Sequence, residues 1–275
     1  MKTRKKREAG IQNQNDSSDI YYIKKRRKTD DKTIRGIVKK TTKEFLEIVN
    51  KSFSEILENL DIYYYLKRLN PYLYKAIGFN RLRDFVEHLV ESKVISKRFE
   101  GKFGDNFFEP IAAAVSEAKE LARWGKGIDL IIKRQKTTYL VSIKSSPHIF
   151  CSAAKRQQIS DLNEARKKKC PEQNVVCVIG YCYGKKNTWT NGILEIAGED
   201  FWTFLSGNPN CFRLIMEVLC KDSQGSVSNR IAVEKNKLVS KLISQYADII
   251  CDKKGEIDWS ELVEINSSSK GKKRA

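Results

Sequence analysis

The sequence has few of the residues that build metal centres and disulfide frameworks. Only 2 of its 275 residues are histidine, and its 7 cysteines include no CxxC pair. We therefore do not expect a zinc finger. Two isolated histidines also do not make a histidine-ligated metal nuclease or a Ser-His triad. An odd number of scattered cysteines is typical of free thiols in a reducing cytoplasm.

Long apolar runs are missing as well. No run approaches the ~20 residues that a membrane-spanning helix needs. The opening residues, MKTRKKREAG, contain no apolar stretch of the kind found in secretory signals. We therefore expect a cytoplasmic protein that has no membrane partner.

Positive charge, by contrast, is abundant. The formal net charge is +18 and the pI about 9.5, while a hydrophobic content of 40% still allows a substantial core. This excess predicts a polyanionic partner, with nucleic acid favoured over a membrane surface. The alternative is a basic surface that serves solubility alone.

Composition and hydrophobic spacing divide the chain into four parts. Residues 1–32 are predicted to be a disordered basic arm, which either touches DNA phosphates or only keeps the chain in solution. Residues 33–95 have the spacing of a helical region. Residues 96–252 are predicted to form an α/β domain that ends in a long helix. Residues 253–275 complete the chain as a C-terminal segment with a basic tail.

The predicted secondary structure indicates a mixed sheet flanked by helices. LNPYL breaks the first helical pattern. A new helix is expected to begin near Phe107, capped by Asp105 or Asn106, because Pro110 fits only a first turn. A hairpin then precedes a helix at about 152–169, strands in NVVCVIGYCYG and GILEIAG, helices in EDFWTFLSG and FRLIMEVLCKD, and a final helix at 226–252. This order is typical of an α/β domain.

The segment GKGIDLIIKRQKTTYLVSIKSS carries the chemistry. Its two strands form a hairpin in which Ser142 and Lys144 share one face and Asp129 can meet them from the other strand. Asp129 is a hard oxygen ligand suited to Mg²⁺, and the backbone carbonyl of Ile143 is a candidate further ligand. Lys144 can hold or activate a water that attacks a phosphodiester. The alternative is a weak cross-strand ion pair at a surface.

These residues resemble the PD-(D/E)xK nuclease superfamily, with Asp129 as the motif aspartate and Lys144 as its lysine. GKFGDNFFEPI is similar to the first helix of that fold, which implies that Glu109 assists the metal. The acid expected two residues before the lysine is Ser142 here, a weak and neutral ligand. Either metal affinity falls for this reason, or Glu109 supplies the missing charge.

An S-x-K variant of the motif occurs in a group of type II restriction endonucleases, and the chain resembles that group over about residues 65–220. The similar segments are LNPYL, FGDNFFEPI, VSIKS, VIGYCYG and IAGEDFWTFL. The resemblance implies a restriction-endonuclease-like mixed sheet flanked by helices, with extra N-terminal and C-terminal helices and a nuclease domain at 96–252. It also implies Mg²⁺ as cofactor and a homodimer that cuts double-stranded DNA at an interrupted GC-rich palindrome of the GGNCC kind.

The same resemblance implies 5′-phosphate ends, a prokaryotic cytoplasm and a cognate DNA methyltransferase encoded nearby. Two alternatives stay open. Because Ser142 removes one acid, the chain could be a DNA-binding protein on a degenerate nuclease fold. It could also be a non-specific repair or recombination nuclease, which shares the chemistry without the sequence specificity.

Candidate DNA contacts follow the motif. They are Lys155, Arg156, Gln157 and Gln158 on the basic helix, and Lys185 and Lys186 in GYCYGKKNTW. Lysine and arginine suit phosphates, and glutamine can read adenine edges or hold phosphates. The alternative for the helix is a solvated face. Trp202 is predicted to belong to the core.

Overall fold

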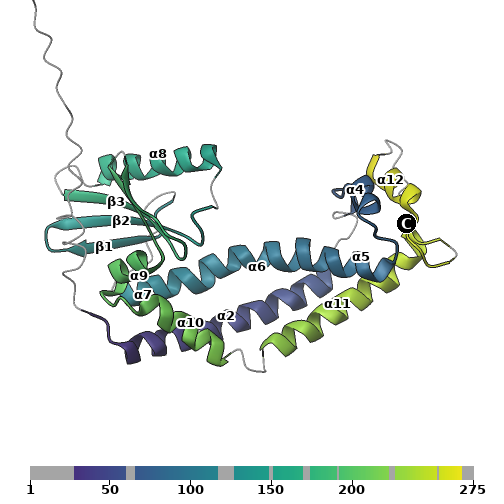
Figure 1. Cartoon of the computed structure of the whole chain (residues 1–275), viewed down its shortest axis with the longest axis horizontal. Helices are drawn as coiled ribbons and strands as arrows, with labels where there is room; N and C mark the ends of the chain where they lie inside the picture. The colour runs from purple at the N-terminus through teal and green to yellow at the C-terminus, as the bar shows by residue number, and fades with distance from the viewer. Residues whose placement is uncertain are drawn as a thin grey trace, which may run out of the picture.

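The computed structural model describes residues 28–59, 66–116, 127–148, 151–169, 174–190, 192–222, 227–252 and 254–267. A sheet with its covering helices lies at one end of an elongated molecule, and a helical arm extends from it (Figure 1). Most of the predicted basic arm, the part at 1–27, and the basic tail after 267 lie outside the described residues.

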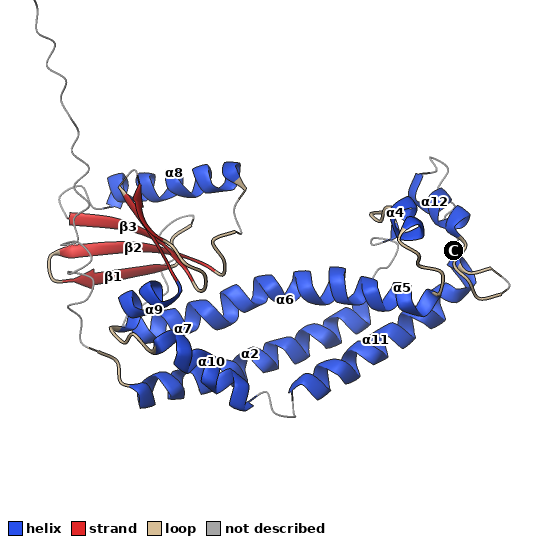
Figure 2. Ribbon diagram, viewed as in Figure 1, coloured by secondary structure: helices blue, strands red, loops and turns tan. Residues whose placement is uncertain are grey.

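The helices account for most of the described chain (Figure 2). They are α2 (Asp31–Asn59), α4 (Pro71–Ala76), α5 (Leu82–Leu89), α6 (Ser96–Phe103), α7 (Glu109–Ser116), α8 (Ser152–Lys169), α9 (Gly198–Ser206), α10 (Cys211–Asp222), α11 (Val227–Ile250) and α12 (Trp259–Ser267), with π-helical segments η1 (Val90–Ile95) and η2 (Gly104–Phe108).

The described strands form one mixed sheet in the order β1-β2-β3-β5-β4. They are β1 (Leu130–Arg134), β2 (Thr137–Lys144), β3 (Asn174–Tyr181), β4 (Asn187–Thr190) and β5 (Ile193–Ala197). The outer pairs, β1 with β2 and β4 with β5, are antiparallel, whereas β2, β3 and β5 run parallel. The predicted α/β class with a mixed sheet, flanked by helices, is confirmed.

Each face of the sheet builds its own core, because the central strands are apolar on both sides. On one face, Leu130, Val141 and Val178 pack with residues of α2, α7, α9 and α10. On the other face, Leu140 and Ile179 pack with residues of α8. Trp202 is 1% exposed in the first of these cores, as predicted.

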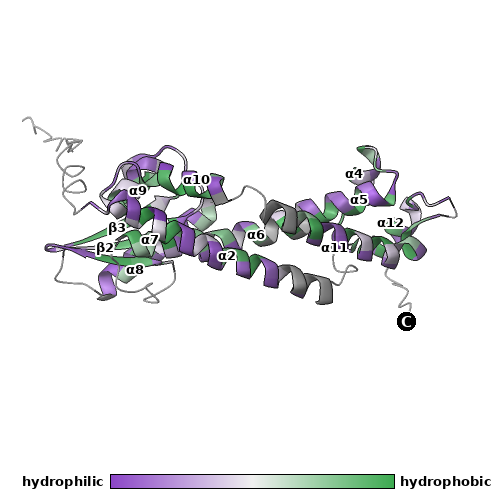
Figure 3. Ribbon diagram, turned by 90° about the horizontal axis from the view of Figure 1, so that it is seen from below, coloured by the Kyte–Doolittle hydropathy of each residue, from purple (hydrophilic) through white to green (hydrophobic). Residues whose placement is uncertain are grey.

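The arm has a third core of its own. Buried residues of α4, α5, η1, α11 and α12 meet there, among them Phe85, Val90 and Leu242. The C-terminal helix α11 therefore packs on α5 and η1 in this core (Figure 1). The arm helices show hydrophobic positions interleaved with hydrophilic ones (Figure 3), the pattern of helices that bury one face.

One continuous helical stretch, residues 82–116, joins the arm to the sheet. The expected helix start near Phe107, capped by Asp105 or Asn106, is wrong, since these residues lie inside the stretch. The π turn of η2 explains how Pro110 is tolerated. The N–H of Glu109 bonds the Gly104 carbonyl five residues back, and the wider turn relieves the clash that a proline ring makes in a regular helix.

Three short elements differ from the sequence prediction. The break at Asn70-Pro71 is the start of α4, where the Asn70 side chain accepts a hydrogen bond from the Leu73 N–H. Residues 187–190, for which no strand was predicted, form the exposed edge strand β4. The C-terminal segment contains α12, which closes the arm core.

Candidate active site

Asp129 lies at the entrance to β1, where the hairpin fixes its side chain. The predicted antiparallel pairing of β1 and β2 is present, and the Asp129 N–H donates to the Val141 carbonyl at 2.9 Å. Its Oδ2 accepts a hydrogen bond from the Ile143 N–H at 2.5 Å and one from the Ser142 hydroxyl at 3.4 Å. The aspartate is thus oriented by the two residues that precede Lys144 in sequence.

Lys144 lies beside this aspartate without being tied to it. Its Nζ is 3.8 Å from Asp129 Oδ2, which is close enough for charge attraction but too far for a hydrogen bond. The two side chains are 22% and 19% exposed. The pair is therefore more buried than an ordinary surface ion pair. Ser142 is fully buried and contributes a neutral hydroxyl to the aspartate rather than a second charge.

Glu109 approaches the same site from α7. Burial and, to a smaller extent, the negative charges of Asp129 and Asp105 raise its pKa from 4.5 to about 7, against the opposing effect of Lys144. These electrostatic effects show that the fold places Glu109 near Asp129 and Lys144, although Glu109 is far from the hairpin in sequence. The Glu109 and Asp129 carboxylates repel each other when both are ionised, and the single positive charge of Lys144 offsets only one of the two negative charges.

An excess of negative charge, here from two carboxylates and one ammonium group, is the property expected of a cation site. Among the residues that the structure describes, no group of three or more His, Cys, Asp or Glu side chains is arranged to hold a metal ion. Mg²⁺ nevertheless often uses only one or two protein carboxylates and completes its shell with water and substrate phosphate. Asp129 and Glu109 fit this pattern as hard oxygen donors. The Ile143 carbonyl remains a predicted ligand.

Cys182 is a neighbour of the site that the sequence did not single out. Burial raises the pKa of its thiol, as do Glu109 and Asp129, so the sulfur stays protonated. Its N–H donates to the Lys144 carbonyl at 2.8 Å, and its own carbonyl accepts from Trp202 Nε1. The end of β2 is in this way tied to the core. No sequence motif could have indicated the role, because Cys182 becomes adjacent only through strand pairing.

The four candidate DNA contacts on α8 differ in their surroundings. Arg156 and Gln157 are exposed, and Gln157 Nε2 donates to Asp161 Oδ1 one turn further along. Gln158 is 8% exposed and donates to the Gly127 carbonyl at 2.8 Å, so it holds α8 against the residue two before Asp129. Lys155 is partly buried and paired with a carboxylate. DNA contact by these residues stays a prediction.

The carboxylate partner of Lys155 is Glu195, another residue that the sequence analysis missed. Glu195 sits in β5 and binds Lys155 and Lys186 together with the Tyr181 hydroxyl. Its position as the one acid in the apolar strand ILEIA was the available signal. Lys185, beside Lys186, is exposed.

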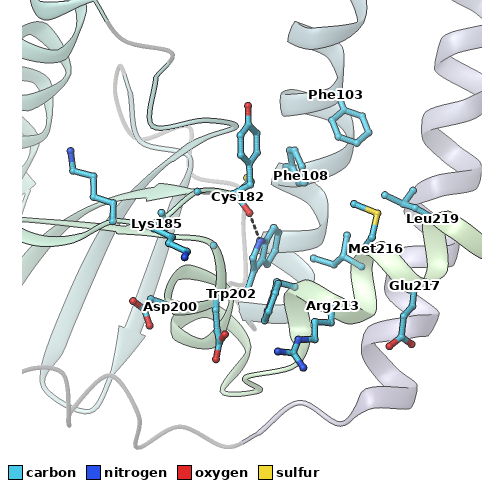
Figure 4. Close-up of a pocket in the computed structure, with 18 of the residues that line it drawn as sticks. Phe103, Phe108, Cys182, Lys185, Asp200, Trp202, Arg213, Met216, Glu217 and Leu219 are labelled. Atoms are coloured by element: carbon cyan, nitrogen blue, oxygen red, sulfur yellow. Dashed lines mark hydrogen bonds between the residues drawn. The ribbon is translucent and has the colours of Figure 1, made fainter.

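A pocket of about 1500 Å³ adjoins the site through Cys182 (Figure 4). Its interior is apolar, with Phe103, Phe108, Trp202 and Met216 pointing into it, while charged side chains such as those of Lys185, Asp200, Arg213 and Glu217 lie around them. Glu109, Asp129 and Lys144 do not line the pocket. The candidate site therefore lies beside the pocket and not in it.

The described helices include none long and apolar enough to cross a membrane. A mixed sheet flanked by helices defines the fold as restriction-endonuclease-like, and the Asp129, Ser142 and Lys144 side chains lie together in it near the helical Glu109. The model of the type II restriction endonuclease EcoO109I family matches residues 32–225, which is more than half of the chain. The chain belongs to this family of type II restriction endonucleases. Comparison with curated proteins gives no match.

Proposed function

We propose that the protein is a Mg²⁺-dependent endonuclease that hydrolyses both strands of DNA at a specific site and leaves 5′-phosphate ends. The observation that carries this proposal is the convergence of Asp129, Lys144 and Glu109 at the sheet edge. Family membership supplies the nuclease class. Mg²⁺, the specific site and the products are the proposed parts.

Each residue of the site has a proposed task. Bound Mg²⁺ would neutralise phosphate charge and lower the pKa of a water. Asp129 and Glu109 would hold it, with Asp129 kept in orientation by the Ile143 N–H and the Ser142 hydroxyl. The Lys144 ammonium, which no hydrogen bond ties to Asp129, is placed to hold the attacking water and to offset charge developing on the phosphate.

The partners follow from charge and symmetry. A chain of net charge +18 suits double-stranded DNA, and a twofold-symmetric palindrome of the GGNCC kind suits a homodimer with one site per strand. The arm offers exposed apolar side chains for such an interface: Tyr72 (68% exposed) and Leu73 (51%) on α4, and Ile77 (58%) directly after it. A prokaryotic cytoplasm and a nearby cognate DNA methyltransferase gene belong to the same proposal.

The proposal is tested by digestion of supercoiled plasmid with and without Mg²⁺. We expect discrete linear fragments only when Mg²⁺ is present. Asp129→Ala and Lys144→Ala should each abolish cleavage while the protein still folds and binds DNA. Lys133→Ala, which removes an exposed lysine from the same hairpin, is the matched control and should cut normally. Nicking by either site variant at a near wild-type rate would contradict the assignment.

One observation favours a second candidate function. Ser142 stands where the motif usually has an acid, and it is fully buried, so the site has one fewer charge than a complete PD-(D/E)xK centre. This would suit a DNA-binding protein on a degenerate nuclease fold, which would bind the plasmid and never cut it. A smear in place of discrete bands would instead indicate the non-specific repair or recombination nuclease.

A further inference from the structure

A second charged cluster lies on the α8 side of the sheet. Lys155 Nζ is 2.8 Å from Glu195 Oε1, and Lys186 Nζ is 3.0 Å from Glu195 Oε2. The Tyr181 hydroxyl donates to the same Oε2 at 2.8 Å. The lysines come from the first turn of α8 and from the residue before β4, so the cluster joins elements that are far apart in sequence.

The cluster contains more positive charge than burial of the glutamate requires. The Glu195 side chain is 5% exposed, and a buried carboxylate needs a partner. One lysine would supply it. The second lysine gives the cluster of Lys155, Lys186 and Glu195 a formal charge of +1. The side chains of Lys155 and Lys186 are 33% and 28% exposed, so solvent reaches both. Burial raises the pKa of Glu195, but its hydrogen bonds outweigh this and hold the pKa below its ordinary value.

The cluster is also close to the proposed active site. Between β2 and β3, Lys144 lies opposite Tyr181 and Ser142 lies opposite Ile179. Between β3 and β5, Ile179 lies opposite Glu195. Two strand spacings separate Ser142 from Glu195, or about 10 Å. The Glu195 cluster is thus two strands away from the end of β2 that carries Ser142 and Lys144.

We propose that Lys155 and Lys186, held together by Glu195 and Tyr181, form one binding site for a single DNA backbone phosphate next to the one that is cut. This inference rests on the proposed function. Glu195 is a positioning residue in it, because it touches the two lysines and not the DNA. Tyr181 fixes the carboxylate, and its raised pKa keeps the hydroxyl protonated as a donor.

The test uses salt dependence of binding to a labelled mixed-sequence duplex in the Lys144→Ala background, where no cleavage occurs. Each phosphate neutralised contributes about 0.9 to the slope of log affinity against log salt. Lys186→Gln leaves a neutral Lys155–Glu195 pair, so the slope should fall by about 0.9. Lys186→Gln combined with Glu195→Gln restores the charge of +1 and should recover the original slope.

Matched variants decide between this site and a purely structural cluster. Lys168→Gln, at the exposed far end of α8, should leave the slope unchanged. An unchanged slope in Lys186→Gln would show that the lysines only neutralise Glu195 and would overturn the inference. So would a loss of about 1.8 in Lys155→Gln combined with Lys186→Gln, since that indicates two separate phosphates.

Two further outcomes keep the inference separate from folding defects and from the proposed function. In the Lys186→Gln/Glu195→Gln protein no buried carboxylate is left without a partner, and the remaining charge, that of Lys155, is on a side chain that is 33% exposed. If it folds, as checked by circular dichroism, and yet binds with the reduced slope of Lys186→Gln, the inference fails. If the Lys144→Ala parent binds no DNA at all, the proposed function fails first.

Discussion

Replacement of Glu109 by glutamine should change both the stability of the protein and its need for metal. The Glu109 pKa of about 7 means that, without metal, the folded protein prefers a neutral side chain. A folded-state pKa above the unfolded value adds stability that is present at low pH and is lost as the pH rises through about 7. The free energy of unfolding of the metal-free wild type should therefore fall relative to Glu109→Gln between pH ~5 and pH ~8.

The size of this difference follows from the shift itself. A pKa moved from 4.5 to about 7 gives about 2 to 3 kcal/mol between these two pH values. Urea unfolding of both proteins in the presence of a chelator measures it, and other titrating groups cancel in the comparison. Glutamine keeps the shape of the side chain and cannot ionise, so it removes the charge alone.

The same substitution tests the metal role. Mg²⁺ must displace the proton from Glu109, so cleavage by the wild type at limiting Mg²⁺ should rise with pH through about 7. Glu109→Gln should lose that rise and should need severalfold more Mg²⁺ for half-maximal cleavage. If both proteins show the same Mg²⁺ requirement and the same pH dependence of stability, Glu109 is only a charge at the start of a helical turn and the reasoning is refuted.

Three further predictions concern the supporting residues and the assembly. Ser142→Ala should reduce cleavage less than Glu109→Gln, and the reverse ranking in Mg²⁺ titrations would make Ser142 a true ligand. Gly180→Ala should lower the free energy of unfolding, measured by urea denaturation, by about 1 to 3 kcal/mol or more, because the added Cβ would lie 1.9 Å from the Phe201 ring. Gly36→Ala on α2 is the control: its added Cβ has nothing within 4 Å, so the substitution should be neutral or stabilising. Light scattering should show a dimer without DNA, and plasmid digestion should give linear product without accumulated nicked circles. A monomer that produces stable nicked circles would point to a nicking nuclease.

Local patterns in the sequence were sufficient for the hairpin and for much of the sheet. Alternation of apolar residues around a polar RQKT turn predicted the pairing that brings Asp129 to Ser142 and Lys144, and the structure confirms it. The helix at 152–169 and the two buried strands after it were also predicted, because each depends on the spacing of neighbouring residues.

Only the tertiary structure decided which distant residues meet. The sequence placed a capped helix start near Phe107, but packing of the long helix between arm and sheet overrides that local signal and carries the chain through Pro110 on a π turn. Gln158 was predicted to face DNA, and its side chain is drawn inward by the Gly127 carbonyl. Glu195 is brought to Lys186 by the antiparallel pairing of β4 with β5, and to Lys155 by the crossover through α8.

The physical reason is the range of the interactions. Strand alternation and helix spacing are fixed within a few residues, so they can be followed along the chain. The pKa of Glu109 and the charge of the Glu195 cluster depend on burial and on carboxylates and ammonium groups brought from other elements. Those quantities exist only after the chain has folded, because burial and charge separation are properties of the packed molecule.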